Sequence, residues 1–118
     1  MEKLIIRKPD DWHLHLREGA VLQNILKYSS DFFGRAIVMP NTKDPITTIE
    51  KGVSYKNSIC SLLSKTNTFK PLMTIYLTDS ISNDVIKRGF QENIFFAAKL
   101  YPATVSYTHL TLPTNREV

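Results

Sequence analysis

With 118 residues and 42% hydrophobic content, the chain can form one globular domain or part of a larger one. Its net charge of +4 comes from scattered basic and acidic residues, so no basic run or aromatic-lined stripe indicates a nucleic-acid face. The single cysteine, Cys60, excludes an intrachain disulfide, and the first apolar patch is too short for a secretory signal or a membrane span, so we expect a cytoplasmic protein.

The first half of the chain predicts two strands around a helix. Residues 3–16 end in an alternating segment, Asp11 to Leu16, that suits a strand. After Gly19, residues 20–33 carry apolar side chains near helical spacing, and Gly34 is expected to end this helix. Residues 35–40 contain a short apolar run typical of a strand that is buried on both faces.

The second half repeats this alternation. Thr47 and Glu50 predict a capping box at the start of a helix over residues 48–63. Its buried side is expected to hold Ile49, Val53, Cys60 and Leu63. A third strand is predicted over 71–77, a short helix capped by Ser82 after it, and a fourth strand over 93–100.

Four strands alternating with three helices indicate an α/β fold with a parallel sheet and helices outside it. A doubly wound sheet and the first half of a (β/α)8 TIM-type barrel both fit this order. The first strand is not followed by a glycine-rich phosphate turn, which weakens the doubly wound option. Polar residues gather at the carboxyl ends of the strands, where barrels carry their sites. A whole barrel needs roughly 200 to 250 residues, so the chain would supply about half of one.

His13 and His15 form the sharpest local motif. Side chains at positions i and i+2 of a strand point to the same face, so both imidazoles could bind one cation such as zinc. By themselves, two histidines at this spacing are more often ordinary structural residues than a pair of metal ligands. The intervening Leu14, and Leu16 beyond, would face the helices.

Four segments share a resemblance to a known family: residues 10–19, 34–41, 71–79 and 97–103. In this order they resemble motifs of the dihydroorotases, within the amidohydrolase superfamily, and most closely the single-enzyme bacterial type. The resemblance implies a zinc-dependent hydrolase of cyclic amide C–N bonds. Its reaction would be the reversible hydrolysis of dihydroorotate to N-carbamoyl-aspartate in de novo pyrimidine (UMP) biosynthesis.

The resemblance also implies roles for individual residues. His13 and His15 would bind the more buried of two zinc ions, and carbamylated Lys99 would bridge both metals. Only a neutral amine adds to carbon dioxide, and burial at a strand end favours that form of lysine. Arg17 and Asn41, together with His15, would bind the substrate, since a guanidinium pairs well with a planar carboxylate. Without the resemblance, Arg17 would be read as a surface ion-pair partner of Glu18 or Asp11.

The sequence also predicts the roles of three further residues and the kind of partner that the protein binds. Asp79 is interpreted as a turn or cap residue, and Trp12 and Tyr101 as packing residues. The substrate would be a small molecule rather than a nucleic acid or a membrane, and the full-length protein a homodimer. Hydantoinases, dihydropyrimidinases and allantoinases remain alternatives, as does a non-catalytic paralogue. The pair of Arg17 and Asn41 favours an acidic substrate.

The pattern breaks near the end of the sequence. In the family, two further histidine ligands and a proton-shuttling aspartate come from later strands, which this chain does not reach. Residues 104–118 have no counterpart, so we divide the chain into 1–103, the N-terminal part of a TIM-barrel domain, and a non-native tail in which His109 has no function. We expect the 118-residue chain itself to be inactive and poorly folded, because half a barrel leaves strand edges and apolar helix faces uncovered.

Overall fold

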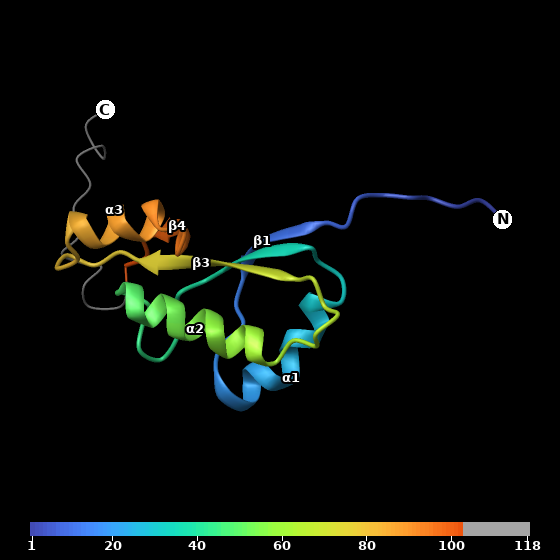
Figure 1. Cartoon of the computed structure of the whole chain (residues 1–118), viewed down its shortest axis with the longest axis horizontal. Helices are drawn as coiled ribbons and strands as arrows, with labels where there is room; N and C mark the ends of the chain where they lie inside the picture. Colours follow the sequence, from blue (N-terminus) through green and yellow to red (C-terminus); the bar gives the residue numbers. More distant parts are fainter. Residues whose placement is uncertain (103–118) are drawn as a thin grey trace.

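The computed structural model describes residues 1–102, in which strands and helices alternate strictly (Figure 1). The elements are β1 (Asp10–Leu14), α1 (Gly19–Ser30), β2 (Arg35–Val38), α2 (Ile49–Ser61), β3 (Lys70–Tyr76), α3 (Asn83–Gln91) and β4 (Phe95–Lys99). The strands form one sheet in the order β1-β2-β3-β4, and every neighbouring pair is parallel. The predicted α/β fold with four parallel strands and three helices is therefore confirmed.

The strand order distinguishes between the two architectures left open by the sequence. A doubly wound sheet reverses its strand order at a switch point, and its helices then cover both faces. Here the order runs in one direction, and side chains of all three helices pack on one core with strand residues such as Val38 and Met73. This sequential winding, with the helices gathered on one side, is the pattern of a (β/α)8 barrel.

The core forms where the strands present aligned apolar residues to the helices. Val38 of β2 lies opposite Leu14 of β1 on one side and Met73 of β3 on the other. Val38 and Met73 are completely buried, and Leu16 beyond β1 is buried with them. The prediction that Leu14 and Leu16 face the helical layer is therefore confirmed.

Phe95 of β4 packs between two helices. Gly52 of α2 and Gly89 of α3 both border its ring, and a Cβ atom built on Gly52 would lie 2.7 Å from Phe95 Cε1. Glycine at these two positions lets the helices approach the sheet closely enough to bury the ring. The helices are thereby fixed against the last described strand.

The structure corrects several boundaries. Residues 3–9 do not join β1, and they extend away from the sheet as an exposed segment (Figure 1). The predicted capping box was wrong by one residue: Thr48, not Thr47, caps α2 by accepting a hydrogen bond from the backbone N–H of Lys51. Helix α1 ends at Ser30, ahead of Gly34, because Asp31 already forms its C-cap and Phe32 projects into solvent.

The predicted buried side of α2 was also partly wrong. Val53 and Cys60 are exposed, whereas Gly52, Tyr55 and Ile59 are buried. The close approach of Phe95 to Gly52 sets which side of the helix faces the core. Trp12 and Tyr101, which were predicted to be packing residues, are about half exposed. The Arg35 guanidinium lies over the ring of Trp12, and the Lys99 ammonium lies over the ring of Tyr101. No helix within residues 1–102 is long and apolar enough to cross a membrane.

Candidate metal centre

His13 and His15 converge at the carboxyl end of β1. Their Nε2 atoms lie 3.3 Å apart, and the ring centroids are 5.1 Å apart with a tilt of 55°. The backbone N–H of His13 donates to the Asp11 carboxylate at 3.0 Å, which helps to fix the end of the strand. Leu14 between the two histidines packs toward the core, so the alternation of the strand turns both rings to the other face.

The spacing of the two imidazoles fits a shared metal ion. Zinc–nitrogen bonds are about 2.0–2.1 Å long, so two ligands at a tetrahedral angle place their nitrogens about 3.3 Å apart. The observed Nε2–Nε2 distance is 3.3 Å. Neutral imidazole nitrogens also have the softness that zinc and its neighbours among the divalent metals favour.

Lys99 and Asn41 meet at the same edge of the sheet. Lys99 ends β4, Asn41 lies in the loop after β2, and the Lys99 ammonium donates to Asn41 Oδ1 at 2.7 Å. The Lys99 ammonium also lies 5.0 Å from the centre of the Tyr101 ring. The Tyr101 backbone is held in turn by a 2.9 Å hydrogen bond from the hydroxyl of Tyr76.

Electrostatic interactions connect Arg17, Lys99 and the two histidines. Burial, followed by the nearby charges of Arg17, Lys99 and His13, lowers the pKa of His15. Burial, followed by the charge of Arg17, also lowers the pKa of Lys99. Cationic groups that disfavour one another's protonation favour an anion in their neighbourhood.

Arg17 lies on the turn between β1 and α1. Its backbone adopts a φ of 57°, and its carbonyl oxygen accepts a 2.7 Å hydrogen bond from the hydroxyl of Tyr55. Within residues 1–102, its guanidinium makes no ion pair, so the expected alternative of a salt bridge to Glu18 or Asp11 is not observed. Those two carboxylates accept backbone N–H groups instead.

The sequence also singled out Asp79 and His109. Asp79 lies in an exposed turn, and His109 falls outside the described residues. In the described part of the chain, no group of three or more His, Cys, Asp or Glu side chains could hold a metal ion. The candidate centre thus consists of two imidazoles and one amine, with Arg17 and Asn41 beside them. The sequence did not single out Tyr55, and it gave Glu18 only as a possible ion-pair partner of Arg17, because both side chains bond to backbone atoms.

The chain thus combines a one-directional parallel β/α sheet with two histidines and a lysine near its carboxyl edge, where barrel folds carry their functional sites. No family model matches the sequence. The chain is 50% identical over 103 residues to dihydroorotases of Cronobacter sakazakii and Escherichia fergusonii, which covers 87% of this chain and 30% of each relative.

Solved structures point to the same proteins. The dihydroorotase from Saccharomyces cerevisiae in complex with 5-fluoroorotic acid matches with a TM-score of 0.71 and 34% identity, over 82% of this chain and 26% of that one. The dihydroorotase from Campylobacter jejuni matches with a TM-score of 0.71 and 34% identity, over 81% of this chain and 28% of that one. The chain is therefore similar, in sequence and in fold, to one part of the dihydroorotases, and it spans about 30% of the length of the curated relatives. These matches confirm both the predicted resemblance and the predicted barrel-type fold.

Proposed function

We propose that the chain is the N-terminal part of a dihydroorotase, which interconverts dihydroorotate and N-carbamoyl-aspartate in the synthesis of UMP. The observation that carries this proposal is the pair of imidazole nitrogens 3.3 Å apart at the same sheet edge as Lys99 and Asn41. The 50% identity to curated dihydroorotases supports the choice of reaction. The 5-fluoroorotic acid in the yeast relative supports a pyrimidine carboxylate as the substrate class.

Three residues of the chain would bind the metal ions. His13 and His15 would hold one zinc ion, and Lys99 would bridge to a second after carbamylation. In that reaction the neutral Lys99 nitrogen attacks the carbon of carbon dioxide and releases one proton to solvent. When bound, zinc would supply hydroxide near neutral pH by lowering the pKa of a bound water.

Substrate recognition falls to Arg17 and Asn41, with His15 beside them. Asn41 Oδ1 is engaged by Lys99, which leaves the Asn41 amide N–H groups free to donate to a carboxylate. The carbamylated Lys99 nitrogen retains one N–H, so it can keep its hydrogen bond to Asn41. The Arg17 guanidinium would add two parallel charged hydrogen bonds to the same carboxylate.

Properties of the full-length protein are inferred from the dihydroorotases that the chain resembles. We propose a small-molecule substrate, a cytoplasmic location and a homodimer for the full-length enzyme. We also propose that residues 1–103 form the barrel part, and that residues 104–118 are a non-native tail. Genomic sequence past codon 103 would test this: two more histidines and an aspartate in a continuing frame support it, and a stop after codon 118 contradicts it.

A chimaera tests the function directly. Because the chain spans 30% of its relatives, residues 1–103 should replace the matching segment of the Cronobacter sakazakii dihydroorotase. The expected result is zinc-dependent hydrolysis of dihydroorotate, with hydantoin, dihydrouracil and allantoin turned over far more slowly. A folded chimaera that prefers one of the uncharged cyclic amides would contradict the proposal. The separate 118-residue chain is expected to be inactive.

A further inference from the structure

The turn between β1 and α1 has an unusual backbone. Arg17 and Gly19 both have a φ of 57°, and Glu18 between them is extended, with a φ of −141°. Glycine adopts the left-handed region freely, but a residue with a Cβ atom does so only where its surroundings hold it. The conformation of Arg17 therefore needs an explanation from its contacts.

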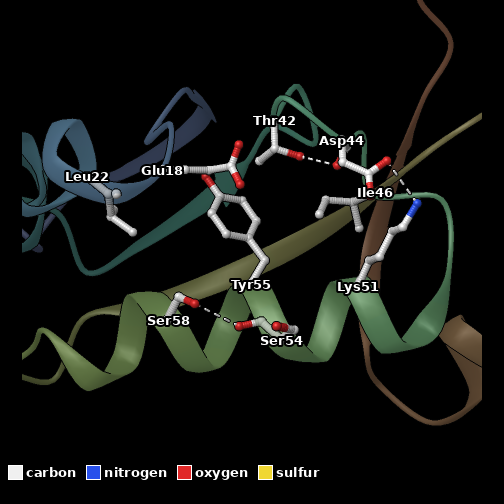
Figure 2. Close-up of a pocket in the computed structure, with 10 residues that line it drawn as sticks. Glu18, Leu22, Thr42, Asp44, Ile46, Lys51, Ser54, Tyr55 and Ser58 are labelled. Carbon is white, nitrogen blue, oxygen red and sulfur yellow. Dashed lines mark hydrogen bonds and ion pairs between the residues drawn. The ribbon is translucent and has the colours of Figure 1, made fainter.

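Two hydrogen bonds supply that explanation. The Tyr55 hydroxyl, from α2, donates to the Arg17 carbonyl at 2.7 Å, and Tyr55 is only 6% exposed. The Glu18 carboxylate accepts the backbone N–H of Lys43, also at 2.7 Å. Figure 2 shows Glu18 beside the ring of Tyr55, which rises from α2 to meet it. Both bonds act on the one turn that carries Arg17.

The Glu18 bond also connects two parts of the candidate site. Lys43 lies two residues after Asn41, so Glu18 ties the turn that carries Arg17 to the loop that carries Asn41. That loop is braced further along, where the Thr42 hydroxyl donates to the Asp44 carbonyl at 2.7 Å and Lys51 pairs with the Asp44 carboxylate at 3.1 Å. The two predicted carboxylate-binding residues therefore share one support.

These residues border a pocket of about 280 Å³ that is open to solvent, drawn in Figure 2. Its lining includes Glu18, Asp44, Lys51 and Tyr55, but neither the three residues of the candidate metal centre nor Arg17 and Asn41 beside them. Burial, followed by the charge of Glu18, raises the pKa of Tyr55 to about 12, so the phenol stays protonated and keeps donating. The network therefore lies beside the candidate site, because its contacts to the site go to backbone atoms of Arg17 and of Lys43.

We propose that Tyr55 and Glu18 are positioning residues that set the affinity for the substrate carboxylate by fixing Arg17 relative to Asn41. The inference rests on the proposed function, because it needs Arg17 and Asn41 to bind that carboxylate. A two-point charged hydrogen bond depends on the alignment of two planar groups, so a small shift of the turn weakens it. Chemistry at the metal centre does not depend on this alignment to the same degree.

The test uses the active chimaera with Tyr55→Phe and Glu18→Ala. Each change should raise KM for dihydroorotate about fivefold, the effect of losing one hydrogen bond, with kcat and zinc content unchanged. Glu18→Gln keeps an acceptor oxygen for the Lys43 N–H and should restore most of the affinity. Matched controls are Tyr28→Phe on the exposed side of α1 and Glu50→Gln in the first turn of α2, both expected to leave KM unchanged.

A double variant separates positioning from general support. In the Arg17→Met background, Tyr55→Phe should raise KM no further, because the residue that it positions is already gone. Equal effects in both backgrounds, an effect confined to kcat or stability, or an unchanged KM in the single variants would each overturn the inference. If Tyr55→Phe does not fold, the same comparison with Glu18→Ala decides. An unsubstituted chimaera that folds but does not hydrolyse dihydroorotate overturns the proposed function itself, before any variant is compared.

Discussion

The ammonium group of Lys99 lies 2.7 Å from Oδ1 of Asn41, although the two residues are 58 positions apart in the sequence. Parallel strands end at the same edge of a sheet, so β4 delivers Lys99 to the loop that follows β2. This contact links the predicted metal bridge to the predicted carboxylate-binding group. It makes Lys99 the first residue to test.

In the chimaera, Lys99→Met should abolish most of the activity. Removal of a group that only supports a metal ligand costs 10–100-fold in many sites, so loss of a bridging ligand should lower kcat/KM by roughly a hundredfold or more. Steady-state hydrolysis of dihydroorotate measures the effect. Lys70→Met, at the opposite end of the sheet, is the matched control and should keep full activity. Comparable activity of the two variants would contradict the metal-bridging role.

His13→Ala or His15→Ala should reduce the zinc content of the chimaera. The two Nε2 atoms lie 3.3 Å apart and would bind the same zinc ion. Either substitution therefore removes one of the two imidazole ligands that this chain would provide. Elemental analysis after dialysis measures bound zinc per chain. Asn57→Ala, on the exposed surface of α2, serves as the control. A full complement of zinc in both histidine variants would rule out the site.

Arg17→Met should raise KM for dihydroorotate by about a hundredfold while sparing zinc content, because a bidentate charged pair to the carboxylate is lost. Initial rates at graded substrate concentrations separate KM from kcat. Arg88→Met is the control, since Arg88 of α3 pairs with Glu92, the residue that follows the helix, at 3.6 Å. An unchanged KM would remove the main argument for an acidic substrate.

Low pH should remove the ion pair between Asp10 of β1 and Arg35 of β2, and thereby destabilise the contact between the two strands. The Arg35 guanidinium hydrogen-bonds both carboxylate oxygens of Asp10, at 3.2 and 2.7 Å, and lowers the pKa of Asp10. A lowered folded-state pKa stabilises the fold above the unfolded pKa of Asp, about 3.9, and this contribution disappears as pH falls through the folded value. In the chimaera, thermal unfolding between neutral pH and pH 2 should therefore show a smaller acid-dependent loss of stability for Asp10→Asn than for the unsubstituted chimaera, which is the parent here. Asp79→Asn should follow the parent, and identical profiles for Asp10→Asn and the parent would contradict the prediction.

Gly89→Ala should destabilise the fold by about 1–3 kcal/mol, because the new methyl group overlaps the ring of Phe95. Chemical unfolding of the chimaera, followed by circular dichroism, measures the change in the free energy of unfolding. Gly34→Ala is a suitable control, since its Cβ would have its nearest neighbour at an ordinary 3.6 Å. Equal stability of the two variants would show that Phe95 can move away at little cost.

Much of the fold could be predicted because its signals are local. Alternation and short apolar runs gave the order of strands and helices, and the spacing of His13 and His15 gave their common face. The errors arose where local pattern was not enough. Thr47 and Thr48 both have side chains that can cap a helix. Thr48 is the cap because α2 begins at Ile49, and the sequence pattern does not fix a helix boundary to within one residue.

The buried side of α2 shows the same limit. Val53 is more apolar than Gly52, so hydrophobicity alone favours it as a core residue, yet Gly52 is buried and Val53 is 41% exposed. The ring of Phe95 occupies space that only a glycine leaves free. A partner 43 positions away therefore decides which side of the helix is buried.

By itself, the sequence determined the α/β alternation, the paired histidines and the likeness to dihydroorotases. Only the tertiary structure decided that Lys99 meets Asn41 and that Tyr55 and Glu18 hold the turn of Arg17. The physical reason is that side-chain periodicity is fixed by the neighbouring backbone, whereas contacts between distant residues depend on how the strands align and how closely the helices pack on them.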